Sequence, residues 1–334
     1  MTWARMVGVA AHLPERRTSS ADIEARLAEL NPGLDVPRDF IERMSGVRYR
    51  HTAPEGWTAA ELAAAAAGKL LADCGRDIAD VDLLIFAATS MSVIEPATAH
   101  IVANLLGASC PVFDVKNACN SVFNAIEVAD AMISAGRYRR VLIACGEWLS
   151  PVIRWQAKDG DLRDYFEVAL SHTVSDAGAA VLLEAADAPG VLRTAAHADS
   201  SAWDAAAATI AVTPGASRLG AFRVDAMRLQ RVFLDIDTGL VDRAFEPLGL
   251  VLSDFAVVCV HQPYTGLLPQ FAERLGLTDD QMVPVVAEHG NVAAAGLLLQ
   301  LTKAVESGRV RRGDLVALVG LASGTSIGIA VVRW

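Results

Sequence analysis

Cysteine is scarce in this sequence of 334 residues, and its spacing is irregular. No two cysteines form a C-x-x-C pair, so we expect neither a disulfide framework nor a zinc or other metal site; the five are Cys74, Cys110, Cys119, Cys145 and Cys259. Basic residues are also in the minority, because 29 Lys and Arg against 39 Asp and Glu leave a net charge of −10. Nucleic-acid binding needs a basic face, so this charge disfavours a nucleic acid as the partner.

Long hydrophobic runs are missing as well. None approaches the roughly 20 residues that cross a bilayer; the longest are Leu62–Ala67, Val292–Leu299 and Leu315–Ala322. No long apolar stretch follows Arg5, so we expect no secretory signal, no membrane association and a cytoplasmic location. The length exceeds the roughly 250–300 residues at which one hydrophobic core stops growing, which favours two domains or two packed halves.

What the sequence does contain is an alternation of apolar, strand-length runs with longer amphipathic runs. In the first half we predict strands at Val81–Thr89, Pro111–Val115, Arg140–Gly146 and Ala177–Leu183, and helices at Glu95–Gly107 and Asn120–Gly136. In the second half we predict strands at Phe255–His261, Met282–Val286, Asp314–Leu321 and Ser326–Arg333, and helices at Gly266–Leu275 and Val292–Gly308. Continuous apolar strands separated by helices indicate mainly parallel sheets that are buried on both faces.

The two halves repeat the same order of elements without measurable sequence identity. Asp82–Thr89 corresponds to Asp254–His261, and Val141–Gly146 corresponds to Leu315–Gly320. We therefore predict a duplicated α/β body of layered sheets and helices, divided into residues 1–184 and 185–334; a single doubly wound sheet is the alternative. Two segments interrupt the order, either to cap a pocket or as ordinary surface insertions; they are Arg154–His172 and Ala198–Arg228.

Cys119 is the first candidate for chemistry, in the segment FDVKNACNSVFNAIEVAD. The predicted strand ends near Lys116 and the predicted helix begins near Asn120, so the thiol lies ahead of the amides at a helix N-terminus. The helix dipole favours an anion there, and we expect it to lower the pKa of the thiol and to prepare a nucleophile. A buried structural cysteine is the alternative, and it is the better interpretation of the cysteines within strands.

Three further candidates also follow predicted strands. His261 ends an apolar strand in VVCVHQPYTG, where α/β sheets often place their sites, although it could simply cap the strand. Asn291, in EHGN, is either a donor or an ordinary helix N-cap, and His289 beside it is equally ambiguous. Ser323 lies in the turn ASGT, either as a hairpin residue or with its amide paired with that of Cys119 in an oxyanion hole.

A thiol, an imidazole, a carboxamide and a small-residue turn at four strand ends suit thioester chemistry when they are taken together. The thiolate would attack an acyl thioester. Neutral His and Asn donors would then stabilise the enolate of a second thioester while a carbon–carbon bond forms.

These motifs resemble the β-ketoacyl-ACP synthase III family of the thiolase superfamily, from Val7 to Trp334. The segments that carry the resemblance are FIERMSGVRYRH, DLLIFAATS, FDVKNACNSVFNAIEVAD, VHQPY, EHGN and GLASGTSIGIAVVRW. The resemblance implies a thiolase-like α-β-α-β-α body with two mixed sheets, and Cys119 as the acyl-accepting nucleophile. It assigns His261 and Asn291 as donors at the second thioester and the amides of Cys119 and Ser323 as the oxyanion hole. It also implies a homodimer that uses acyl-CoA or acyl carrier protein and no other cofactor.

Some positions depart from the family. Phe40 and Met44 stand where the family usually has the Trp and Arg that hold the CoA nucleotide, although Phe40 could still stack on a base. The NAC around Cys119, EHGN and SVIEPATA resemble the acyl-CoA head-to-head condensing enzymes of bacterial olefin and β-lactone biosynthesis. In that branch a Glu from the partner subunit acts as a base, and Glu95 is at the matching position. Alternatively, Glu95 is a dipole-favoured residue in the first turn of a helix.

The leading functional hypothesis is a condensing enzyme that loads an acyl group on Cys119 and joins it to a malonyl or second acyl thioester. In a second hypothesis, the enzyme transfers the same acyl group from Cys119 to an alcohol or amine. This transfer has less need of the Asn291 donor. A third is a non-catalytic partner subunit, which commonly loses the nucleophile or a donor, whereas this chain keeps Cys119, His261 and Asn291.

Overall fold

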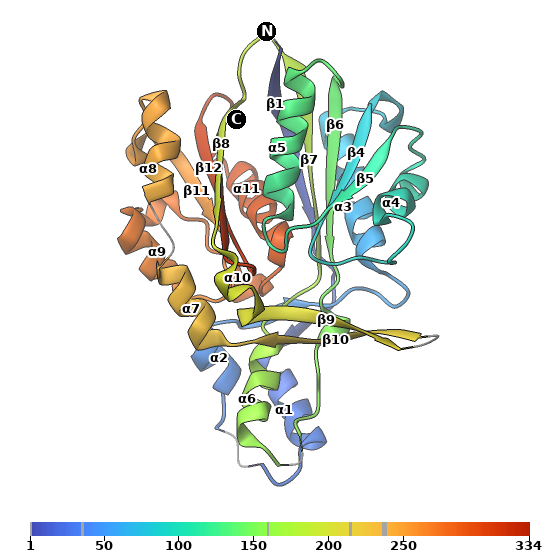
Figure 1. The fold of residues 1–334 in the computed structure, drawn as a ribbon, viewed down its shortest axis with the longest axis vertical. Coiled ribbons are helices and arrows are strands. Elements are labelled where there is room, and N and C mark those ends of the chain that lie inside the picture. Colours follow the sequence, from blue (N-terminus) through green and yellow to red (C-terminus); the bar gives the residue numbers. More distant parts are fainter. Residues whose placement is uncertain (1, 35–36, 159, 214–215, 236–238) are drawn as a thin grey trace.

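Two sheets form the body of the protein in a computed structural model that describes residues 2–34, 37–158, 160–213, 216–235 and 239–334 (Figure 1). The five-stranded sheet has the order β1 (Trp3–His12), β7 (Ala177–Ala186), β6 (Arg140–Glu147), β4 (Leu83–Ala87) and β5 (Val112–Val115). The four-stranded sheet has the order β11 (Phe255–Val260), β12 (Leu315–Ala322), β13 (Ser326–Arg333) and β8 (Val191–Ala198).

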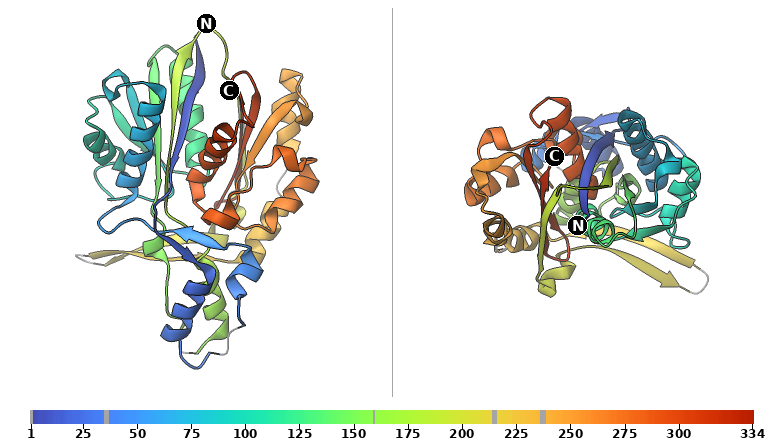
Figure 2. Two further views of the ribbon diagram at one scale, coloured as in Figure 1. Left: turned by 180° about the vertical axis from the view of Figure 1, so that it is seen from behind. Right: turned by 90° about the horizontal axis from the view of Figure 1, so that it is seen from above.

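Helices cover both faces of both sheets. Between the sheets lie α5 (Ser121–Ser134) and α11 (Gly296–Glu306), as the views of Figure 2 also show. Outside the first sheet lie α3 (Ala59–Cys74) and α4 (Thr98–Leu106), and outside the second lie α8 (Gly239–Phe245) and α9 (Leu267–Leu275). This is the predicted α-β-α-β-α layering, and it explains why β4 and β12 are buried along their whole length.

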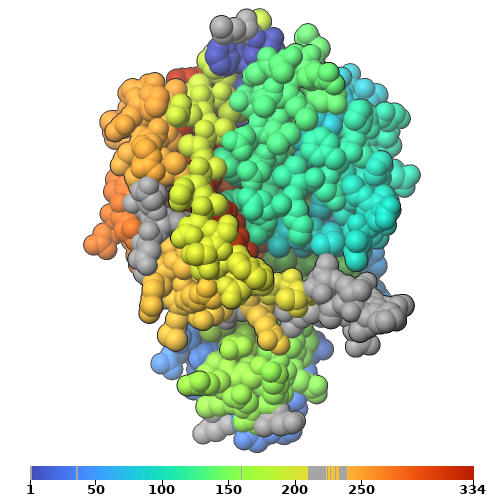
Figure 3. All heavy atoms as spheres, in the orientation of Figure 1, coloured from blue at the N-terminus to red at the C-terminus, as the bar shows by residue number. Residues whose placement is uncertain are grey.

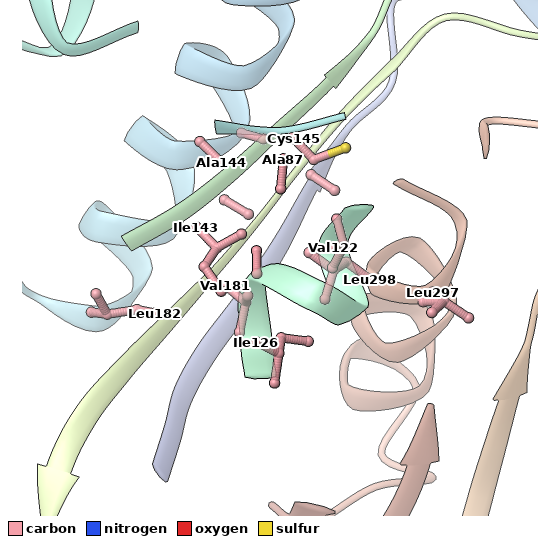
Figure 4. Close-up of a cluster of buried hydrophobic side chains, with 14 of the residues drawn as sticks. Ala87, Val122, Ile126, Ile143, Ala144, Cys145, Val181, Leu182, Leu297 and Leu298 are labelled. Carbon is pink, nitrogen blue, oxygen red and sulfur yellow. The ribbon is translucent and has the colours of Figure 1, made fainter. Parts of the chain in front are cut away.

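The main hydrophobic core fills the space around the two central helices. Val122 and Ile126 of α5 lie between Ile143 of β6 and the paired Leu297 and Leu298 of α11 (Figure 4). Each of these side chains is almost fully removed from water. Burying a Val, Leu or Ile side chain contributes roughly 1.5–3 kcal/mol, so the two central helices are held by packing on both sides.

The strand directions correct one expectation, that of mainly parallel sheets. β4 pairs in parallel with β5 and β6, and β11 pairs in parallel with β12. The remaining neighbours in the two sheets are antiparallel. The sheets are therefore mixed, because β13 returns beside β12 after a tight turn, and β7 returns beside β6 after an insertion that contains a helix in the smaller lobe, so both strands run antiparallel to their neighbour.

The topology confirms the repeat of element order. In both sheets a parallel pair, β4–β6 or β11–β12, is followed by two antiparallel neighbours, β7 and β1 or β13 and β8. The predicted boundary after Glu184 falls close to the end of β7 at Ala186. Whether residues 1–184 and 185–334 act as separate units stays a prediction.

Three predicted elements differ from the structure. Met282–Val286 is not a strand, because the backbone of Val283 and Val285 bonds to the side chain of Gln262 instead of to a neighbouring strand. The helix predicted to begin at Glu95 begins at Thr98, after a cis Glu95–Pro96 peptide bond. The predicted helix Val292–Gly308 is divided into the 3-10 turn η7 (Ala293–Ala295) and α11.

A smaller lobe lies below the main body (Figure 3). Its own apolar cluster joins α1 (Ser20–Leu30), α2 (Phe40–Ser45) and α6 (Leu162–Ser171). The hairpin β9–β10 (Ala206–Thr213, Ala216–Val224) crosses between lobe and body (Figure 1), next to α7 (Ala226–Asp235). The interruptions predicted at Arg154–His172 and Ala198–Arg228 form α6 and this hairpin, and their role as a cap stays a prediction.

The remaining elements are short connections. They are β2 (Arg17–Ser19), β3 (Tyr49–His51), α10 (Val286–His289), η1 (Ile78–Asp80), η2 (Ser150–Val152), η3 (Ser200–Ala205), η4 (Glu246–Leu248), η5 (Leu252–Asp254) and η6 (Asp279–Gln281). Within the described residues, every helix is too short or too polar to cross a membrane.

Candidate active site

Cys119 lies in a tight turn between β5 and the central helix α5. Ala118 has a positive φ of 47°, which bends the chain sharply just before the cysteine. The hydroxyl of Ser121 donates to the carbonyl of Ala118 at 2.7 Å and accepts from the amide of Asn117 at 2.8 Å. These bonds fix the turn, and they place the half-buried thiol directly before the N-terminus of α5.

The electrostatic state of Cys119 differs from the expectation. Burial, and secondarily the charge of Glu147, raise the pKa of the Cys119 thiol to about 12. The prediction of a lowered pKa is therefore wrong for the free protein, because desolvation and a neighbouring carboxylate outweigh the helix N-terminus. The Cys119 thiol is therefore neutral in the free protein, and it would have to lose its proton in order to act as a nucleophile.

Asn120 connects the cysteine turn to the second half of the molecule. Its Nδ2 donates to Ser326 Oγ at 2.9 Å and to the Ser326 carbonyl at 3.2 Å. A Cβ on Gly320 would lie only 2.1 Å from Asn120 Oδ1, so the absence of a side chain there makes room for Asn120. Ser323 lies in the hairpin turn between Ala322 and Ser326, and the contact of Asn120 with Ser326 brings that turn beside Cys119.

His261 follows the last residue of β11 and lies against the neighbouring strand. Its amide donates to the carbonyl of Val319 at 3.0 Å, one residue before Gly320. The side chain is 4% exposed, and burial lowers the pKa of His261 to about 4. The imidazole is therefore neutral near pH 7, as its proposed donor role requires. The side chain of Gln262 holds the same loop through Gln300, the carbonyl of Val283 and the amides of Val285 and Val286.

Asn291 lies in a turn that is bound to the first half. Its amide donates to the carbonyl of Thr173 at 2.9 Å, and its carbonyl accepts from Ser175 at 3.0 Å. Its Oδ1 accepts from the amide of Ala293 at 3.0 Å, which leaves Nδ2 as the donor end of the side chain. The Asn291 side chain bonds to the first residue of the short turn η7, whose N-cap is Val292, so the interpretation as the N-cap of the long helix is wrong; α11 begins at Gly296.

Glu147 is a site residue that the sequence reasoning missed. It ends β6, its side chain is fully buried, and it accepts from the amide of Ala294, close after Asn291, at 3.1 Å. Its charge also acts on Cys119. The available signal was a lone acidic residue at the end of the apolar run RVLIACGE, since buried carboxylates are rare unless they are bonded.

Glu95 is placed apart from these residues. It lies in the exposed loop between β4 and α4, next to Ile94, which is 70% exposed. The N-terminus of α4 is satisfied by Asp114, whose carboxylate accepts from the amides of Thr98 and Ala99 at 2.8 Å each. The interpretation of Glu95 as a first-turn residue of that helix is therefore wrong.

Phe40 and Met44 lie on α2 in the smaller lobe. The Phe40 ring stacks on Phe166, with centroids 4.6 Å apart, so one of its faces is occupied by the protein. Met44 is 59% exposed. Among the described residues, no group of three or more His, Cys, Asp or Glu side chains is arranged to hold a metal ion.

Cys119, His261 and Ser323 follow the carboxyl ends of β5, β11 and β12, whereas Asn291 follows the short helix α10, and hydrogen bonds link the segments that carry them. Their links are the contacts of Asn120 with Ser326, of His261 with Val319 and of Glu147 with Ala294. A thiol, a neutral imidazole and a carboxamide donor on linked segments can accept and activate an acyl group.

Comparisons with known proteins identify the family. Residues 113–200 match the family 3-Oxoacyl-[acyl-carrier-protein (ACP)] synthase III, and residues 245–334 match its C-terminal region. The chain is 30% identical to a β-ketoacyl-[acyl-carrier-protein] synthase III of Thiobacillus denitrificans over 336 residues, which covers 100% of both proteins.

Solved structures of OleA from Xanthomonas campestris share the fold. A histidine-to-alanine variant is 24% identical with a TM-score of 0.91, covering 99% of this chain and 98% of that one. A cysteine-to-serine variant with bound lauric acid and lauroyl-CoA is 24% identical with a TM-score of 0.90, covering 99% of both. With its thiolase fold and its full-length relationship to a curated member, the chain belongs to the β-ketoacyl-ACP synthase III family of acyl-transferring, condensing enzymes.

Proposed function

We propose that Cys119 accepts an acyl group from acyl-CoA or acyl carrier protein, and that the site then joins this group to a second thioester. The proposal is supported by the Cys119 turn at the start of α5, the buried neutral His261 and the donor end of Asn291, whose segments are bonded through Asn120 to Ser326, His261 to Val319 and Asn291 to Thr173. No other cofactor is part of the proposal.

Acylation balances as a thiol exchange. The Cys119 sulfur attacks the carbonyl carbon of the thioester, and its proton passes to His261. The carbonyl oxygen becomes an oxyanion that the backbone amides of Cys119 and Ser323 would stabilise, since preorganised donors act strongly where charge develops. The carbon–sulfur bond to the carrier then breaks, and the carrier thiolate leaves with the proton.

Condensation uses the neutral donors. The second thioester forms an enolate by losing carbon dioxide from a malonyl group or a proton from an acyl group. His261 and the Nδ2 of Asn291 would donate to its oxygen, because a neutral imidazole and an amide can stabilise an oxyanion without transferring charge. The enolate carbon attacks the acyl carbon on Cys119, and the sulfur leaves as a thiolate that recovers a proton.

If Glu95 acts as a base, the second thioester is an acyl-CoA, from which the base removes a proton. Its exposed loop, with Val93 38% and Ile94 70% exposed, offers apolar surface to a second copy of the chain. We propose a homodimer in the cytoplasm in which Glu95 reaches the partner's site as the base that removes the proton. The OleA structures include glutamate variants and one with lauroyl-CoA bound, which favours long acyl-CoA substrates here.

The mass of the intact protein after incubation with lauroyl-CoA tests the first step. We expect a lauroyl adduct in the unchanged protein and in Cys110→Ser, which alters another half-buried thiol, but none in Cys119→Ala. A missing adduct with acyl-CoA and with acyl carrier protein thioesters would contradict the proposal.

Product analysis tests the second step. A β-ketoacyl-CoA formed from lauroyl-CoA alone, or the β-keto acid that water releases from it by hydrolysis of the thioester, supports the role of Glu95, whereas a requirement for malonyl carrier protein supports decarboxylative condensation. An acylated protein that forms neither product contradicts condensation and favours transfer to an alcohol or amine.

A further inference from the structure

Glu147 is a fully buried carboxylate with hydrogen bonds to two different parts of the chain. Its Oε1 accepts from the amide of Thr89 at 2.8 Å and from the amide of Ala294 at 3.1 Å. Its Oε2 accepts from the amide of Ser90 at 3.1 Å and from the hydroxyl of Ser90 at 2.9 Å. Burying a carboxylate without such partners is strongly unfavourable, so this arrangement is specific to an acidic side chain.

The partners also define its charge state. Three of them are backbone amides, and the Ser90 hydroxyl already accepts from the amide of Trp148 at 2.9 Å, so its proton points to Glu147. A protonated carboxyl would direct its own proton at a donor. Burial raises the pKa of Glu147, but this set of donors fits the ionised form.

The bonds of Glu147 end at two segments that carry candidate site residues. Thr89 and Ser90 begin the loop that leads to Glu95. Ala294 belongs to the short turn η7, whose first amide, that of Ala293, holds the Oδ1 of Asn291. The Glu147 carboxylate belongs to the half that contains Cys119. Through its bond to Ala294 it helps to fix the orientation of Asn291, which belongs to the other half.

We propose that Glu147 is a positioning residue of the condensing site, which ties the Asn291 turn to the half of the molecule that carries Cys119. This inference rests on the proposed function for the roles of Cys119 and Asn291. The negative charge of the same carboxylate also opposes ionisation of the Cys119 thiol. Glu147 would therefore affect both the orientation of Asn291 and the pKa of Cys119.

Glu147→Gln tests the charge. We measure the pH dependence of Cys119 alkylation by iodoacetamide with peptide mass spectrometry. The pH of half-maximal alkylation should fall by at least about one unit, because a neighbouring negative charge is removed. Asp176→Asn is the matched control. Asp176 is also fully buried, and it accepts from the amides of Ala53 and Leu149 and from both the amide and the hydroxyl of Ser150. Its charge does not contribute to the raised pKa of Cys119.

Glu147→Asp tests the positioning role, because it keeps the negative charge but shortens the side chain that bonds to Ala294. We expect its alkylation profile to match the unchanged protein and its condensation rate to fall at least about 10-fold, while acyl loading on Cys119 continues. This variant also carries the test if Glu147→Gln does not fold.

An unshifted alkylation profile in Glu147→Gln, or an equal shift in Asp176→Asn, would overturn the role of the charge. Full condensation activity in Glu147→Asp would overturn the positioning role. The alkylation profiles need no substrate, so they remain readable even if the unchanged protein takes no acyl group and the proposed function fails.

Discussion

His51 Nε2 and His289 Nδ1 lie 3.0 Å apart, and this contact joins strand β3 to the short helix that leads to Asn291. The other ring nitrogen of His51 lies 2.6 Å from the carbonyl oxygen of Pro14, which can only accept. His51 therefore carries its proton on Nδ1, and its Nε2 accepts from the Nδ1–H of His289. A proton on His51 Nε2 would remove the acceptor, and a proton on His289 would place a charge on a partly buried ring, so the neutral pair is the favoured state.

This pair predicts a loss of stability in acid. Burial, followed by the charges of His51, Lys303 and Arg17, lowers the pKa of His289 from 6.5 to about 4. Between these values the unfolded chain binds the proton and the folded protein does not, so stability falls as the pH falls through this window. The slope is at most ~1.4 kcal/mol per pH unit for this proton, and less because the ring is partly exposed.

Urea unfolding at pH 7 and pH 5 measures this effect. His289→Asn keeps a donor for His51 but does not titrate, so its loss of stability between the two pH values should be smaller. His100→Asn alters an exposed histidine on α4 and should keep the slope of the unchanged protein. Equal slopes in all three proteins would contradict the prediction.

Gly320→Ala should distort the cysteine turn. The new Cβ would lie 2.1 Å from Asn120 Oδ1, a buried atom without a hydrogen-bond partner among the described residues. We expect a cost of about 1–3 kcal/mol and slower acylation of Cys119, because Asn120 must move. Gly68→Ala in α3 meets open space and should be neutral or stabilising by up to about 1 kcal/mol. Thermal unfolding and acyl loading of both variants distinguish these outcomes.

Asn291→Ala should separate the two half-reactions. We expect the acyl adduct on Cys119 to form as before, whereas carbon–carbon bond formation falls about 10²–10³-fold, as removal of one oxyanion donor typically costs. Single-turnover measurements of adduct formation and of β-keto product give the two rates. If both rates fall together, Asn291 does not act at the second thioester alone.

Glu95→Gln should remove only the reaction that starts from acyl-CoA without a malonyl group. A general base typically contributes 10²–10⁴-fold, so we expect a loss of that order in β-keto acid formation and no change in the adduct on Cys119. Glu55→Gln, which alters another exposed acidic residue, serves as the control. An unaffected condensation rate in Glu95→Gln would rule out its role as the base.

The sequence predicted the layered, duplicated fold because the apolar runs alternate with amphipathic ones, and this signal survives without sequence identity. The apolar pattern did not predict the strand directions, since a buried antiparallel strand such as β7 has the same pattern as a parallel one, whereas the family resemblance did imply two mixed sheets. It also misassigned Met282–Val286, whose backbone is satisfied by a distant side chain, Gln262.

At the candidate site, Cys119 and His261 do follow strands as predicted, whereas Asn291 follows the short helix α10, and the raised pKa of Cys119 was not predicted. The pKa of Cys119 depends on burial and on Glu147, which is 28 positions away along the chain by residue number (147 − 119) and reaches the site only through the fold. Likewise, the first-turn interpretation of Glu95 failed because Asp114, from the next strand, takes the N-terminus of α4.

The neutral resting state of Cys119 has a consequence for chemical durability. Peroxides and other electrophiles react with thiolates far more readily than with thiols. A buried sulfur that stays protonated is therefore a poor target for sulfenic acid formation, although we propose the same sulfur as the nucleophile in turnover. The burial that raises the pKa of Cys119 would thus also protect the idle protein from oxidative damage.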